Sequence, residues 1–317
     1  MNPSGRMGMA RWWRIAALGG LALAAMAALI LLYLAHLEKK AWEEAISRST
    51  PVAFERFLHH YPDSEFAPQA RAQVRRLIAE GLPPAVREIK RARIMVDEEY
   101  REGELISGYR EILGPLIRYT AEDFLKYVGV DIGDSAGQGS EAVLEIRIRG
   151  QFNGTQYGKT AAEFYWTGAV VEGTVRFKAS DLEVGEEFAG KSDSLEPPKN
   201  ITPHRYSTTP HLIVKQAGLP LIEAKIAKVV ARVFGTQALV AYLYPQRAAK
   251  YEGAVAALQE LKDPATVEPL IEMLADGDEG IRGDARNILK AITGQDFKDD
   301  QEKWQEWWAQ NRADTDH

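Results

Sequence analysis

The sequence predicts a multidomain protein with an N-terminal transmembrane helix, an all-α hairpin, a small α+β domain with antiparallel strands and a C-terminal α-solenoid. Three observations carry this prediction. Residues 15–37 form an apolar run, residues 144–149 and 171–178 alternate between apolar and polar side chains, and an apolar pattern recurs within residues 218–317. The expected boundaries are 1–14 for a cytoplasmic tail, 15–37 for the membrane span, 38–82 for the hairpin, 85–200 for the α+β domain, 201–217 for a linker and 218–317 for the solenoid.

Composition limits the classes of function. The chain has 317 residues, of which 45% are hydrophobic, so it can bury more than one core. Its formal net charge is -6, with both signs interspersed, which argues against nucleic acid as a partner. Cysteine is absent, and this excludes disulfides, cysteine-based zinc sites and a thiol nucleophile. We expect neither a cofactor nor a metal.

The N-terminal apolar run predicts a membrane anchor. Residues 15–37 carry no formal charge, and at about 1.5 Å per residue they can cross a hydrocarbon core of roughly 30 Å. Lysine and arginine counts on the two flanks tie, so the free N-terminal amine and the short tail decide for a cytoplasmic N-terminus. We therefore expect a signal anchor in the lipid bilayer of a single-pass inner (cytoplasmic) membrane protein, with its C-terminal part periplasmic. The alternative is a cleaved signal peptide.

Residues 38–82 predict a helical hairpin. Aromatic and apolar residues recur at helical spacing before and after Pro62, which ends the first helix. The stretch FLHHYPDSEFAPQARAQV resembles a tetratricopeptide-like repeat of bacterial envelope proteins, but it covers one unit where about three are needed for a free-standing array. We read it as a spacer or docking hairpin. His59 and His60 face about 100° apart on a helix, so we expect them to be solvated and not to share a metal.

The string GDSAG at residues 133–137 raises the question of a catalytic serine. It resembles the nucleophile elbow of hormone-sensitive-lipase-like esterases, in which a helix follows the serine. Here Leu144, Ile146 and Ile148 alternate with charged residues, which is strand periodicity, and no upstream HGGG-type loop occurs. We therefore expect Ser135 to lie in a connecting turn. An envelope serine hydrolase using Ser135 is the alternative function.

Other polar groups of the α+β domain have weaker functional interpretations. A short helix around residues 119–129 precedes strands joined by tight turns, one of them at Asn153-Gly154. His204 and His211 could bind a metal with an acidic neighbour, but they lie in a turn-rich stretch. A basic cluster could touch anionic lipid heads, although a solvated face is the ordinary role of such residues; it comprises Arg87, Lys90, Arg91 and Arg93.

The C-terminal region contains an internal repeat. Ala254, Leu258 and Leu261 recur about 31 residues later, a spacing that suits one helical hairpin of a solenoid. The residues after Pro269 resemble the short bacterial type of HEAT repeat, with the pattern Pro269, Leu270, Ile271, Leu274, Asp276, Asp278, Ile281, Arg282, Ala285 and Leu289. Three tryptophans of the tail have the spacing of a cap over the last apolar face: Trp304, Trp307 and Trp308. Iron-binding HEAT enzymes carry His-Glu pairs, and this chain has none, so catalysis by the repeats is not expected.

A basic row on the second repeat helix is the candidate partner-binding site. Arg282, Arg286 and Lys290 recur every fourth residue, and the same row one repeat earlier includes Tyr251 and Gln259. The HEAT resemblance implies that this inner surface binds a ligand. Because arginines offer paired donors to carboxylates, the row favours an acidic segment of an unknown protein partner. The alternative is that these cations are solvated and pair with Asp284 or Glu279. The predicted function is a membrane-anchored, envelope-exposed protein-interaction or scaffold module without catalytic activity.

Overall fold

The computed structural model describes the backbone of residues 4–102, 105–106, 112–133, 142–156, 164–192, 210–245 and 252–312. Within these ranges it describes no side chain for residues 4–24, 102, 105–106, 153–156, 164–167 and 210–212.

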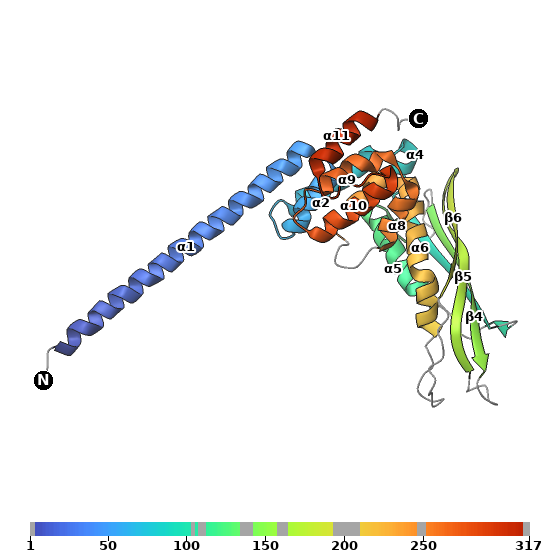
Figure 1. The fold of residues 1–317 in the computed structure, drawn as a ribbon, viewed down its shortest axis with the longest axis horizontal. Coiled ribbons are helices and arrows are strands. Elements are labelled where there is room, and N and C mark those ends of the chain that lie inside the picture. Colours follow the sequence, from blue (N-terminus) through green and yellow to red (C-terminus); the bar gives the residue numbers. More distant parts are fainter. Residues whose placement is uncertain are drawn as a thin grey trace.

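Helix α1 (Ser4–Arg48) begins the chain and extends away from the rest of the molecule, which it contacts only near its C-terminal end (Figure 1). Its described side chains begin at residue 25, and several large apolar ones are exposed: Met26, Leu29, Ile30, Leu31, Leu32, Tyr33 and Leu34. Residues 4–14, expected to be a separate tail, form the first turns of this helix.

The structure contradicts the predicted membrane-spanning helix. None of the helices in the described part of the chain combines the length and the apolar character needed to cross a membrane. The side chains of residues 15–24 lie outside the described set. The finding contradicts the transmembrane helix, the signal anchor and the single-pass membrane localisation, and the predicted contact with a bilayer loses its support.

Helices α2 (Pro51–His60) and α3 (Ala67–Glu80) form a hairpin against the end of α1. The Thr50 hydroxyl accepts a hydrogen bond from the Ala53 amide at 3.1 Å and so caps α2. The Trp42 ring stacks on Phe66 with 5.2 Å between ring centroids. A separate apolar cluster holds the three helices together: Trp42, Ala45, Ala53, Phe54, Phe57, Ala70, Val74 and Ile78, with Ala238.

The strands form one mixed sheet in the order β2-β1-β4-β5-β6, with β3 also paired to β1. Their bounds are β1 Arg91–Glu102, β2 Leu105–Ile106, β3 Asp131–Ile132, β4 Ala142–Gln156, β5 Phe164–Ala179 and β6 Leu182–Lys191. Strands β4, β5 and β6 pair antiparallel, whereas β1 and β4 pair parallel. This corrects the predicted antiparallel domain. Helix α5 (Gly114–Tyr127) intervenes between β1 and β4 and lets the chain cross over, so β4 returns in the direction of β1.

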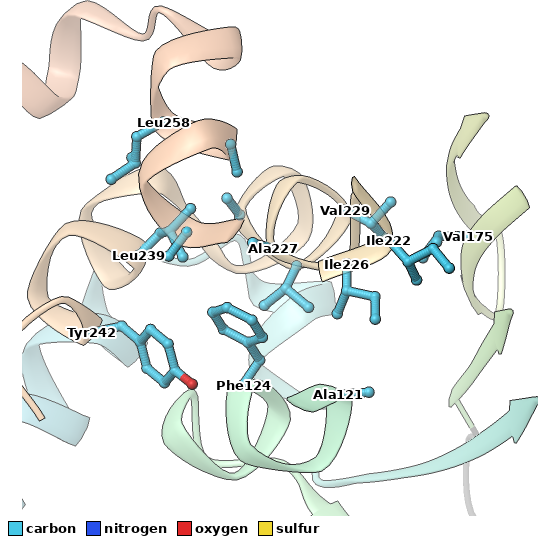
Figure 2. Close-up of a cluster of buried hydrophobic side chains, with 14 of the residues drawn as sticks. Ala121, Phe124, Val175, Ile222, Ile226, Ala227, Val229, Leu239, Tyr242 and Leu258 are labelled. Carbon is cyan, nitrogen blue, oxygen red and sulfur yellow. The ribbon is translucent and has the colours of Figure 1, made fainter. Parts of the chain in front are cut away.

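One face of the sheet is covered by helices. Apolar residues of β4 such as Leu144 and Ile146 are fully buried, and α6 (Pro210–Phe234) packs on β5 and β6. The approach is close, because a Cβ atom at Gly190 would lie 2.2 Å from the Ala217 carbonyl oxygen. Residues 210–217, which were expected to lie in a linker, form the first turns of α6. Figure 2 shows side chains of α5, β5, α6, α7 and α8 directed toward one another in a continuous core.

The remaining helices complete that core but do not form a clear solenoid, which corrects the last part of the predicted fold. They are α4 Pro84–Arg87, α7 Thr236–Tyr242, α8 Glu252–Leu261, a 3-10 turn Pro264–Thr266, α9 Val267–Met273, α10 Glu279–Thr293 and α11 Gln301–Asn311. In a solenoid each unit contacts its neighbours along the chain. Here α9 packs on α7, α10 and α11 and also on the N-terminal helix α2. The repeat pattern therefore belongs to a helical layer shared with the sheet and the hairpin.

Candidate functional site

The predicted basic row lies on α10, and its cations have partners within the chain. The Arg282 guanidinium donates to the Asp276 carbonyl at 2.7 Å and pairs with Glu279 and Asp299. Arg286 Nη1 lies 2.8 Å from Asp299 Oδ1. The Lys290 ammonium lies 2.8 Å from the Asp296 carboxylate, and its proximity holds the pKa of that carboxyl below its usual range. Acidic residues between α10 and α11 thus engage the whole row.

The other half of the predicted site is only partly described. Tyr251 lies outside the described residues, and Gln259 is half-buried on α8. The pairing of Arg282 with Glu279, named as the alternative, does occur. Binding of a partner protein by the row stays a prediction.

Several further candidates fall on residues that the structure does not describe. Ser135 and His204 are among them, and of His211 only the backbone is described, within α6. Among the described residues, no three His, Asp or Glu side chains gather closely enough to hold a metal ion. Arg87 of the basic cluster binds backbone groups of the same chain: its guanidinium donates hydrogen bonds to the Leu82 and Glu80 carbonyls, both at 2.7 Å.

The hairpin is attached to the helical layer through a buried carboxylate, which we call the Asp276 junction. The Asp276 side chain is fully buried, and its Oδ2 atom lies 3.3 Å from His60 Nε2, 3.6 Å from Arg56 Nε and 3.1 Å from the Tyr244 hydroxyl. Its Oδ1 atom accepts from the Asp278 amide at 2.8 Å. These donors come from α2, from the turn after α7 and from the loop before α10. The carboxylate therefore joins segments far apart in the sequence.

Next to this junction lies a concave site, which we call the hairpin cleft. Its volume is about 410 Å³, a size that accommodates a few amino-acid residues. Helices α2, α3 and α5 and the turn after α7 provide its lining: Glu55, Leu58, His59, Pro62, Arg71, Val74, Arg75, Lys126, Tyr127, Tyr244 and Pro245. The cleft thus lies where the hairpin meets the body of the molecule.

Glu55 is the buried carboxyl group among the described lining residues, with 6% of its surface exposed. The Tyr127 hydroxyl donates to Glu55 Oε1 at 3.1 Å. Burial raises the pKa of Glu55 from 4.5 to about 7, although the Tyr127 hydrogen bond and the nearby Arg71 charge act in the opposite direction. Burial and the Glu55 charge together raise the pKa of Tyr127 well above its usual range. The carboxyl of Glu55 can therefore gain or lose a proton near neutral pH.

Cations from two helices border the cleft. Arg71 and Arg75 lie one turn apart on α3, and both are exposed. Among the described residues, Arg71 donates a 3.4 Å hydrogen bond to the Pro62 carbonyl and its charge acts on Glu55, whereas Arg75 forms no ion pair there. Lys126 on α5 pairs with Glu122 at 3.1 Å. With apolar Leu58 and Val74 beside them, these groups suit an anionic ligand that also carries apolar surface.

Sequence reasoning did not single out Glu55 or Tyr127. The one available signal was that Val52 and Leu58, which lie about one turn before and after Glu55 on the predicted helix, are apolar, and an acid on an apolar face is either solvated or specifically partnered.

Comparison of the sequence with protein-family models and with curated proteins finds no match. The likeness to tetratricopeptide and HEAT repeats therefore rests on the short motifs given above.

Proposed function

We propose that this protein is a protein-interaction module without catalytic activity of its own, and that it holds an extended segment of a partner protein in the hairpin cleft. The observation that carries the proposal is the cleft itself, in which two arginines with spare donor capacity stand beside apolar side chains. A peptide segment offers both kinds of contact at once.

Binding is the role that this lining supports best. The described lining residues include no serine or threonine, and the Glu55 carboxyl that could act as a base already accepts a hydrogen bond from the Tyr127 hydroxyl. Arginine side chains suit recognition, because a guanidinium presents several donors in a fixed plane. Hydrolysis through Ser135, which lies outside the described residues, stays a separate prediction.

A protein partner fits the charge of the chain better than nucleic acid does. The net charge is -6, whereas a nucleic-acid site needs an extended basic surface. The cations of the cleft are few and local, which suits a short segment.

Selection from a random peptide display library tests the proposal. The full chain should enrich peptides, and Leu58→Trp, which fills the cleft, should weaken their binding at least about tenfold, or about 1.4 kcal/mol. The matched control is Ala72→Trp, because Ala72 is exposed on α3 and does not line the cleft. Equal loss in both variants, or no enrichment by the wild-type chain, would contradict a peptide-binding cleft.

A further inference from the structure

The cations that border the hairpin cleft favour one class of peptide segment. Arg75 has no ion pair among the described residues, and the only hydrogen bond shown for Arg71 is the long one to the Pro62 carbonyl. Arginine binds a carboxylate through two parallel hydrogen bonds, and such charge-assisted bonds are stronger than neutral ones. Lys126, which pairs with Glu122 at 3.1 Å, borders the cleft from the α5 side. Aspartate or glutamate side chains of a partner are therefore the groups that this border recognises.

Glu55 brings a second carboxyl group into the same cleft. It is buried and receives one neutral donor, the Tyr127 hydroxyl, at 3.1 Å. Two ionised carboxylates in one cleft repel each other, and this repulsion raises the pKa of the carboxyl that is less well solvated. A protonated Glu55 would remove this repulsion and supply a hydrogen-bond donor.

We propose that the hairpin cleft binds an acidic peptide segment and that Glu55 takes up a proton when the segment binds. This inference rests on the proposed function and names both its ligand and its regulation. The ionisable groups that line the cleft around Glu55 are Arg71 and Arg75 from α3, Lys126 and Tyr127 from α5, His59 from α2 itself and Tyr244 after α7. His59 also has a side chain that can bind a proton, so the test includes a His59 variant beside the Glu55 variant.

Proton uptake follows from the position of the Glu55 equilibrium. The pKa of Glu55 in the free protein is about 7, so much of the carboxyl is ionised at pH 7 to 8. A bound carboxylate raises this pKa further, and binding then draws a proton from solution. If the increase is about one pKa unit, affinity at pH 8 should be about fivefold weaker than at pH 6.

Isothermal titration calorimetry with the full chain provides the test. The probe is a short peptide of alternating Glu and Leu residues with blocked ends, titrated at pH 6, 7 and 8 in buffers of different ionisation enthalpy. We expect net proton uptake near pH 7.5 and weaker binding at pH 8. In Glu55→Gln the uptake should disappear and the affinity should no longer change with pH, whereas His59→Gln should keep both effects.

A charge-reversal pair checks the ligand class. Arg75→Glu should weaken binding of the acidic probe at least about tenfold, and Arg76→Glu should have little effect, because Arg76 lies on the same helix but pairs with Glu80 and does not line the cleft. A probe with Lys in place of Glu should not bind.

The outcomes separate this inference from the proposed function. Selected peptides that bind while the acidic probe does not would overturn the acidic ligand and leave a peptide-binding cleft. Binding of the acidic probe without proton uptake, or uptake that persists in Glu55→Gln, would overturn the role of Glu55 alone. Loss of the uptake in His59→Gln would assign the proton to His59 and contradict the proposal.

Discussion

The Asp276 junction and the hairpin cleft, which share Tyr244, each contain a buried carboxyl group, and the two carboxyl groups have different surroundings. Asp276 is approached by a guanidinium, an imidazole, a phenol and a backbone amide. Glu55 receives one hydrogen bond, from the Tyr127 hydroxyl, and burial raises its pKa to about 7. Both lie between the hairpin and the body of the molecule, yet only the first is surrounded by donors.

The difference shows how one interface can contain both an attachment point and a binding site. A buried carboxylate with several donors is costly to disturb, because removing it leaves those donors unpaired. A buried carboxyl with one donor instead exchanges a proton with solvent near neutral pH. Both carboxyl groups are buried, so the number of hydrogen-bond donors around each one is what distinguishes Asp276, the attachment point, from Glu55, the group of the binding site.

Removal of the Asp276 carboxylate should have the largest effect. Asp276→Ala leaves Arg56, the Tyr244 hydroxyl and the Asp278 amide without their shared acceptor, so we expect a loss of about 3–5 kcal/mol in the free energy of unfolding. Urea unfolding at pH 7 measures it. The matched control is Asp296→Ala, whose exposed pair with Lys290 should contribute less than about 1 kcal/mol. Similar losses in the two variants would show that the junction is not an attachment point.

Replacement of Glu55 should change how stability depends on pH. Because the pKa of Glu55 is about 7 in the folded protein against 4.5 for the ordinary side chain, the folded state binds more protons between these values. Its stabilising contribution is thus present below about pH 4.5 and is lost as the pH rises through 7.

Glu55→Gln, which stays neutral, should therefore gain stability relative to wild type between pH 5 and pH 8, by on the order of 3 kcal/mol. Urea unfolding at both pH values measures the difference. A constant difference between the two proteins would mean that Glu55 is ionised in the folded state throughout this range.

The smallest effect is expected on the basic row of α10. Arg286 and Asp299 are each about one-third exposed, with side-chain exposures of 31% and 33%, so water screens their pairing. Arg286→Ala should cost about 0.5–1 kcal/mol, and less in 0.5 M salt, as measured by thermal unfolding. A loss above about 2 kcal/mol would place this pair with the Asp276 junction as part of the structural framework.

Local elements followed well from the sequence. The spacing of Phe54, Phe57 and Tyr61 predicts a helix that ends before Pro62, and the structure ends α2 at His60. The alternation of Leu144, Ile146 and Ile148 predicts a strand, which is β4. Such patterns record which side of an element is buried, and that is a local property.

The arrangement of those elements did not follow. An alternating pattern does not name the neighbouring strand, so the parallel pairing of β1 with β4 left no mark in either segment. The repeat of Ala254 and Leu258 at Ala285 and Leu289 records two similar apolar faces. It does not record that α9, between them, also packs against α2. The predicted solenoid failed for this reason.

The candidate site depended on the same missing information. Glu55 and Tyr127 are 72 residues apart, and neither belongs to a motif. The basic row was visible because its members lie on one helix, but its acidic partners Asp296 and Asp299 lie beyond the turn that ends α10. Spacing reveals groups on one element and misses groups that folding brings together.

The contact between the Thr50 hydroxyl and Glu272 Oε2 joins residues separated by 222 positions. A ribosome that adds 5–20 residues per second needs about 10–45 s to travel that distance. During this interval the first hairpin has been made but the helix it rests on has not. We infer that the nascent hairpin stays accessible until synthesis is almost complete, and protease treatment of stalled chains of increasing length would measure this. Protection of residues 50–61 from the protease in chains that end before Val267 would mean that the hairpin packs against another segment before α9 is made.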